Sequence, residues 1–133
     1  MASLGTKAIF KQDLQTVWDV IATVENYSSW RSDIKNLEII DENYYVESTM
    51  DGYETTFRVM KKEPFSRIEL RMDNVNLEGR WSIQLNRTSE GTEFLLNQTA
   101  NAYKLYMQPF VRNYLKAQQM MYMENLKSRL EQL

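Results

Sequence analysis

Residues 67–73 read Arg-Ile-Glu-Leu-Arg-Met-Asp, and their side chains alternate between charged and apolar. Ile68, Leu70 and Met72 fall on one face of an extended chain, and the charged residues fall on the other. This period of two is typical of a strand in an antiparallel sheet with one buried and one solvated face. The stretch therefore predicts a β-rich fold with its apolar core on one side of a sheet.

The period of two continues on both sides of this stretch. We predict further strands over residues 6–10, 37–41, 44–50, 53–62, 77–86 and 92–102. Asp51-Gly52 is the strongest hairpin signal, because both central positions of a type I′ turn need positive φ. The strands after residue 36 follow one another through short turns, which predicts an antiparallel meander.

Near the N-terminus the spacing of apolar residues changes from two to three or four. Asp13 is a typical helix N-cap, and Val17, Trp18 and Ile21 follow it at helical spacing. Residues 25–30 predict a second short helix or turn. Two short helices are therefore expected between the first strand and the second.

A long helix is predicted at the C-terminal end of the sequence. Pro109 suits its first turn, where no amide hydrogen is needed, and residues 110–133 contain no Gly or Pro. At 1.5 Å per residue this helix is about 35 Å long. A helix of this length needs a large concave partner to bury its apolar stripe.

The composition excludes several classes of active site. The chain has 133 residues with no Cys and no His. Thiolate nucleophiles, disulfides, His bases and metal sites built from Cys or His are therefore ruled out. No Asp-rich calcium-loop motif appears, so we expect no metal and no other cofactor. The length fits a single domain over residues 1–133.

The charge balance argues against a nucleic-acid partner. The formal net charge is −2, whereas nucleic-acid-binding domains usually carry a basic excess. Basic residues gather in residues 58–72, which form either a solvated face or a surface for an anionic partner. No segment is apolar enough for a signal peptide or a membrane span, so we expect a cytoplasmic location.

Several short motifs accompany this order of elements. They are Val17-Trp18-Asp19-Val20-Ile21 with Tyr27-Ser-Ser-Trp30, Glu63-Pro64 with Arg67-Ile68, and Gly79-x-Trp81 with Gly91-Thr92. The motifs and the element order resemble the START/Bet v 1-like (SRPBCC) superfamily and, within it, small bacterial proteins of the polyketide cyclase/dehydrase family. The resemblance covers essentially the whole chain. It implies an α+β helix-grip fold, in which a curved antiparallel sheet of about seven strands wraps around the C-terminal helix and two short helices close one end.

Such a fold encloses a space between the sheet and the C-terminal helix. The inward residues that we expect to bind a ligand there are Tyr53, Phe57, Met72, Trp81, Phe94, Gln98, Met107, Phe110, Tyr114, Gln118 and Met121. This lining suits a hydrophobic small molecule, and it equally suits a filled core. Gln98 and Gln118 either satisfy each other or await a polar group of a ligand, because an unpaired buried amide is costly.

The function that these features favour is binding of a hydrophobic small molecule, such as a lipid, quinone, polyketide or aromatic metabolite. A cyclase or dehydratase acting on an aromatic or polyketide substrate is an alternative, and it needs a positioned acid or base. The alternation places Val46, Ser48 and Met50 inward, which leaves Glu47 and Glu54 on solvent faces. We therefore assign no catalytic residue and lean against an enzyme.

A protein-interaction or co-chaperone-like module is the second alternative. Residues 120–123 read Met-Met-Tyr-Met, which puts apolar side chains all around one helical turn. Met120 or Met123 then faces outward as a single exposed residue or contacts a partner. The sequence thus predicts a monomer or a weak homodimer.

Overall fold

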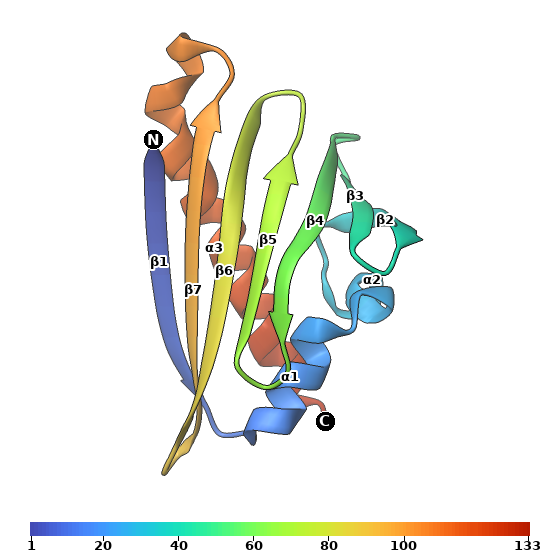
Figure 1. Cartoon of the computed structure of the whole chain (residues 1–133), viewed down its shortest axis with the longest axis vertical. Helices are drawn as coiled ribbons and strands as arrows, with labels where there is room; N and C mark the ends of the chain where they lie inside the picture. The colour runs from blue at the N-terminus through green and yellow to red at the C-terminus, as the bar shows by residue number, and fades with distance from the viewer.

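Seven antiparallel strands form one sheet in the computed structural model, which describes all 133 residues (Figure 1). The strands are β1 (Ala2–Phe10), β2 (Ile34–Asp41), β3 (Tyr44–Thr49), β4 (Glu54–Glu63), β5 (Arg67–Asp73), β6 (Leu77–Thr88) and β7 (Gly91–Ala102). Their order across the sheet is β1-β7-β6-β5-β4-β3-β2. The strands from β2 to β7 form a meander, and β1 pairs with β7 at the far side. Consequently β1 and β2 are the two edges of the sheet.

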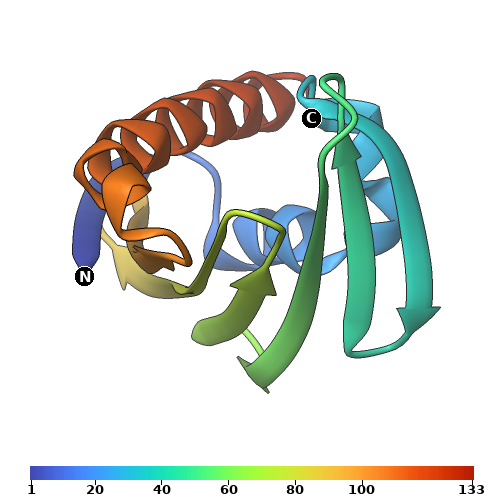
Figure 2. The same ribbon diagram turned by 90° about the horizontal axis from the view of Figure 1, so that it is seen from above.

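The helices lie on the concave side and at one end of this sheet. They are α1 (Leu14–Ala22), the 3₁₀ turn η1 (Val24–Asn26), α2 (Tyr27–Trp30), the 3₁₀ turn η2 (Leu105–Met107) and α3 (Gln108–Glu131). Figure 2 shows the sheet curving beneath α3, with α1 crossing behind the space between them. The α+β helix-grip fold is confirmed, with the two short helices α1 and α2 between β1 and β2.

Local signals fix the ends of the helices as the sequence predicts. The Asp13 carboxylate accepts a hydrogen bond from the Thr16 amide at 2.9 Å, which caps α1. Pro109 occupies the first turn of α3. The side chain of Gln108 accepts a bond from the Ala102 amide at 2.8 Å and ties the start of α3 to the end of β7.

Gly79 of β6 lies against the backbone of β7 with no room for a side chain. A Cβ atom at this position would lie 2.2 Å from the Thr99 carbonyl oxygen. No side chain fits in that space, so glycine lets the two long strands bend together around α3.

The hairpin between β3 and β4 forms, but its predicted turn type is wrong. Gly52 has a φ of +86°, whereas Asp51 does not have positive φ. The Thr49 amide instead donates to the Tyr53 carbonyl oxygen at 2.9 Å, and the Gly52 amide donates to that of Thr49. The connection is therefore longer than a two-residue type I′ turn, which needs two positive φ values.

The predicted inner face of β3 is also wrong. Tyr45 and Glu47 are buried, and Val46 and Ser48 are only partly so. Met50 lies beyond the strand and is exposed. The error is a shift of one residue, which moves every side chain of a strand to the opposite face.

The structure does not bury three α3 residues that the sequence placed inward, Tyr114, Gln118 and Met121. The buried residues are Val111, Leu115, Gln119, Tyr122, Leu126 and Leu130. Tyr114 and Met121 are exposed, and Gln118 is partly buried. Their position follows from the placement of α3 over the β1 side of the sheet, where the side-chain amide of Gln119 donates to the Leu4 carbonyl oxygen of β1 at 3.1 Å.

Candidate functional site

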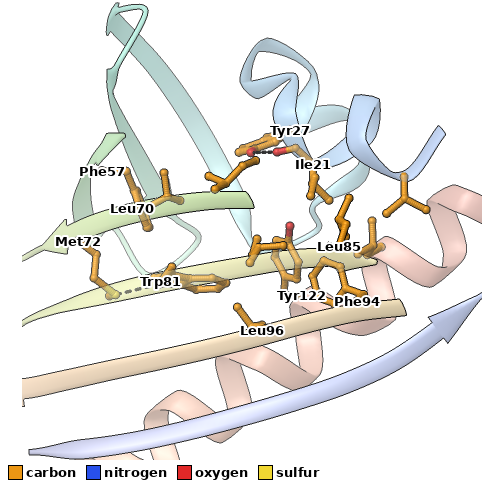
Figure 3. Packing of buried hydrophobic residues seen from close by; sticks show 14 of the residues in the cluster. Ile21, Tyr27, Phe57, Leu70, Met72, Trp81, Leu85, Phe94, Leu96 and Tyr122 are labelled. Carbon is orange, nitrogen blue, oxygen red and sulfur yellow. Dashed lines mark hydrogen bonds between the residues drawn. The ribbon is translucent and has the colours of Figure 1, made fainter. Parts of the chain in front are cut away.

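The space between the sheet and α3 is filled by aromatic side chains near α1 and α2. Tyr45 stacks on Phe57 with ring centres 5.2 Å apart, and Tyr122 meets the edges of Trp30 and Trp81 at 5.7 and 5.5 Å. Figure 3 shows Trp81 of β6 beside Tyr122 of α3, with Phe57 of β4 farther away next to Leu70 of β5. The cavity left among them is about 20 Å³, room for a single water molecule. We call this region the closed end.

A buried ion pair lies within the closed end. Arg31, at the C-terminal end of α2, donates to both carboxylate oxygens of Glu47 at 3.1 and 3.2 Å. It also donates to both oxygens of Asp33, at 3.2 and 2.9 Å, and its guanidinium lies 5.3 Å from the centre of the Tyr122 ring. This paired geometry is the one in which a guanidinium binds carboxylates most strongly.

The prediction that Glu47 faces solvent is therefore wrong. The residue is 5% exposed and points into the core. Burial raises the pKa of its carboxyl, and the Arg31 charge opposes that rise. The negative charges of Glu47 and Asp33 raise the pKa of Arg31 above its ordinary value, because they stabilise the cation. Glu54 is exposed, as expected.

The opposite end of the space is open. A cavity of about 380 Å³ lies between the β3–β4 hairpin, the β5–β6 turn and the start of α3. Its lining residues are Thr49, Asp51, Tyr53, Thr55, Asn74, Asn76, Leu77, Ala102, Met107, Phe110, Val111 and Tyr114. We call this cavity the mouth, and the view in Figure 2 looks toward it. Its volume lies at the small end of the range for sites that bind small molecules.

The lining of the mouth combines seven apolar or aromatic residues with five polar ones, of which only Asp51 is charged. The side-chain amide of Asn74 donates to the Thr55 hydroxyl at 3.3 Å, and the hydroxyls of Tyr53 and Tyr114 belong to residues that line the same cavity. Partial burial, with the Glu47 charge, raises the pKa of Tyr114, so this phenol stays protonated near neutral pH. Neutral hydroxyls and amides in an apolar cavity can orient a ligand without requiring it to carry charge.

Three glutamines of the interior satisfy one another. Gln98 donates to the Gln118 side chain at 2.9 Å and accepts from Gln119 at 3.1 Å. Gln119 in turn accepts from the Thr6 hydroxyl at 2.6 Å. The predicted partnership of Gln98 with Gln118 exists, and Gln119 completes it.

The eleven predicted site residues do not lie together. Tyr53, Met107, Phe110 and Tyr114 line the mouth. Phe57 and Trp81 line the closed end, Met72, Phe94 and Gln98 are fully buried, Gln118 is partly buried, and Met121 is exposed. The structure therefore brings four of the eleven residues together around an open cavity.

The sequence did not predict part of the mouth or the buried ion pair of Arg31 and Glu47. Leu77 and Ala102 supply apolar wall at the mouth, although each occurs in a segment that the sequence correctly identified as a strand. Arg31 carried no signal, because it follows a short helix whose geometry the sequence left open. An acidic residue on an apolar strand, such as Glu47, could have prompted a search for a basic partner.

The basic stretch over residues 58–72 is largely paired with its own neighbours. Arg67 lies 3.1 Å from Glu69, and Arg71 lies 3.5 Å from Glu78. The Arg58 guanidinium lies 4.6 Å from the centre of the Tyr44 ring. This stretch is therefore a solvated face with its charges partly balanced.

The structure contains no group of three or more Asp and Glu side chains placed to hold a metal ion. None of its helices combines the length and the apolar character needed to cross a membrane.

Comparison with known proteins gives this architecture a family. Residues 11–120 match the model of the polyketide cyclase/dehydrase and lipid transport family. The chain belongs to this family. No curated protein matches the sequence significantly.

Solved structures show how widely the fold of this family member is shared. A START superfamily protein from Mycobacterium smegmatis matches with a TM-score of 0.88 at 11% identity, over 98% of this chain and 97% of that one. The Zhui aromatase/cyclase from Streptomyces sp. R1128 matches with a TM-score of 0.85 at 12% identity, over 98% and 93% of the two chains. Identities this low establish the fold alone.

Proposed function

We propose that this protein binds one hydrophobic small molecule at the mouth of the helix-grip cavity. The observation that carries the proposal is the contrast in packing along one interior. Aromatic rings fill the closed end, whereas about 380 Å³ stays open at the mouth between Leu77, Val111 and Phe110. An open apolar cavity of this size is the usual form of a small-molecule site.

The apolar and polar side chains of the mouth orient the bound molecule. Leu77, Ala102 and Val111 form an apolar wall, and Thr55 with Asn74 supplies hydroxyl and amide groups. A molecule with an apolar body and one neutral polar group satisfies both surfaces. Lipids, quinones and polyketides of modest size fit this description, and membership of a lipid transport and polyketide cyclase family supports it.

We assign Glu47 a structural role, although a cyclase or dehydratase would need a carboxyl of this kind. Both of its oxygens accept bonds from Arg31, and the cavity beside them has room for a water molecule only. A general acid or base must come within hydrogen-bond reach of its substrate. The geometry at the mouth therefore supports binding more strongly than catalysis.

Filling the mouth tests the proposal. N-phenyl-1-naphthylamine, an uncharged apolar fluorophore, is titrated into the wild type and into Ala102→Trp, whose indole occupies the cavity. Ala117→Trp is the matched control, because Ala117 is an exposed residue of α3 outside the mouth. We expect the wild type and Ala117→Trp to bind the probe and Ala102→Trp to lose at least about tenfold in affinity. Equal binding by all three proteins would overturn the proposal.

A further inference from the structure

A groove beside the edge strand β1 is separate from the proposed ligand cavity. β1 pairs only with β7, so nine residues of its outer edge meet no other strand. Between this edge and α3 lies a groove of about 520 Å³, lined by Leu4 and Thr6 of β1 and by residues of α3 that include Lys116, Met120 and Glu124. A long unpaired edge is a template for another strand unless something protects it.

The chemistry of this groove is self-complementary. Met120 is 56% exposed near the middle of the helix, Lys116 lies one turn before it, and Glu124 lies one turn after it. If two copies of α3 cross antiparallel with Met120 on the two-fold axis, each Lys116 faces the partner's Glu124. Symmetry makes this pair occur twice.

The same axis suits the edge of the sheet. Thr6 is the central residue of β1, and its hydroxyl donates to the side chain of Gln119, the neighbour of Met120. β1 and α3 run in the same direction, since Gln12 at the far end of this edge bonds to the Leu130 carbonyl oxygen. A single two-fold axis can therefore pass beside both Thr6 of β1 and Met120 of α3.

Antiparallel pairing of two β1 strands about Thr6 introduces no repulsion. Lys7 is the one charged residue of β1, and in this register it faces the partner's Gly5 rather than the partner's Lys7. Like charges directly opposite each other would destabilise a strand pair.

We propose that a second copy of this chain occupies the groove. The two β1 edges join antiparallel, the two α3 helices pack across Met120, and the sheets of both copies become continuous. Methionine suits such a contact because its flexible, polarisable side chain adapts to a facing surface. This dimer is independent of the proposed ligand, because the mouth lies at the other side of α3, between Tyr114 and β4.

Sedimentation velocity over a wide range of protein concentration tests the dimer. Met120→Glu places two like charges on the axis, and Met121→Glu is its matched control, since Met121 is 43% exposed but does not line the groove. We expect the wild type and Met121→Glu to dimerise and Met120→Glu to weaken the dimer by about tenfold or more. A wild type that stays monomeric, or a dimer that Met120→Glu does not weaken, would overturn the proposal and leave the groove to a different partner.

Charge reversal tests the antiparallel register. Lys116→Glu and Glu124→Lys should each weaken the dimer, and the double variant should restore it because the opposite charges face each other again. Failure of the double variant to restore the dimer contradicts the register.

A cross-link gives a second measurement that does not depend on weakened binding. The chain has no cysteine, so Met120→Cys introduces a single thiol next to the axis, and mild oxidation should give a disulfide-linked dimer. Met121→Cys should link far less. Equal linking by the two variants would contradict the placement of the axis.

Discussion

The closed end and the mouth both contain tyrosines, but the two regions differ in packing. Tyr27, Tyr45 and Tyr122 are buried at the closed end, whereas Tyr53 and Tyr114 are exposed at the mouth. The closed end receives side chains from α1, α2, α3 and the middle of the sheet, so every ring meets others. The mouth is bordered by turns and the first turns of α3, which supply fewer neighbours. Tyrosines occur at both ends, and the number of converging elements decides which end stays open.

Phenylalanine truncation should separate the two ends most clearly. Phe94 is 0% exposed and Phe110 is 67% exposed. Phe94→Ala should lower the free energy of unfolding by about 3–5 kcal/mol, because it leaves a cavity in a packed core. Phe110→Ala should change it by no more than about 0.5 kcal/mol. Urea denaturation of both variants checks this, and equal losses would mean that the mouth is packed as tightly as the closed end.

Breaking the ion pair of the closed end should have an effect of similar size. Arg31→Met leaves Glu47 buried without a partner, so we expect a loss of about 3–5 kcal/mol in the free energy of unfolding. Asp33→Asn is the control, because the Asp33 side chain is more exposed, at 22%, and its loss leaves the Arg31–Glu47 pair intact. Denaturation curves in which both variants lose equally little would contradict a structural role for the pair.

Removing single hydroxyls should give a smaller difference between the two ends. The Tyr27 hydroxyl donates to the Ile21 carbonyl oxygen inside the core, so Tyr27→Phe should cost about 1–3 kcal/mol. Tyr114→Phe should cost less than about 0.5 kcal/mol, because its hydroxyl lies at the open mouth. Thermal and urea unfolding measure both. A larger loss for Tyr114→Phe than for Tyr27→Phe would reverse the comparison.

The pH dependence of stability should report the smallest effect. Burial raises the pKa of Glu47 above its ordinary value of 4.5, so the folded chain takes up this proton at a higher pH than the unfolded chain does. Relative to Glu47→Gln, the wild type should therefore gain stability as pH falls from neutral toward 4.5 and lose it as pH rises. Unfolding curves at several pH values compare the two slopes, and parallel slopes would show that Glu47 keeps an ordinary pKa.

The fold could be predicted because antiparallel strands leave a visible pattern. In β5 the apolar residues Ile68, Leu70 and Met72 are all buried, and the strand has the bounds that its alternation predicts. β3 was assigned to the wrong face because Tyr44 and Tyr45 give no clear alternation, and the burial of Glu47 depends on a partner 16 residues away. Gln118 and Met121 of α3 were placed inward for a related reason. Gln119 and not Gln118 is fully buried because α3 leans toward β1, and helical spacing does not encode that rotation.

The sequence by itself determined the order of elements and the absence of Cys and His chemistry, since these follow from local spacing and composition. The helix-grip architecture came from the resemblance of its motifs to the START/Bet v 1-like superfamily. Tertiary structure decided which end of the interior is open, that Glu47 faces Arg31, and that Gln119 joins Gln98. These features depend on how side chains from distant segments share one volume, and local sequence periodicity carries no information about that volume.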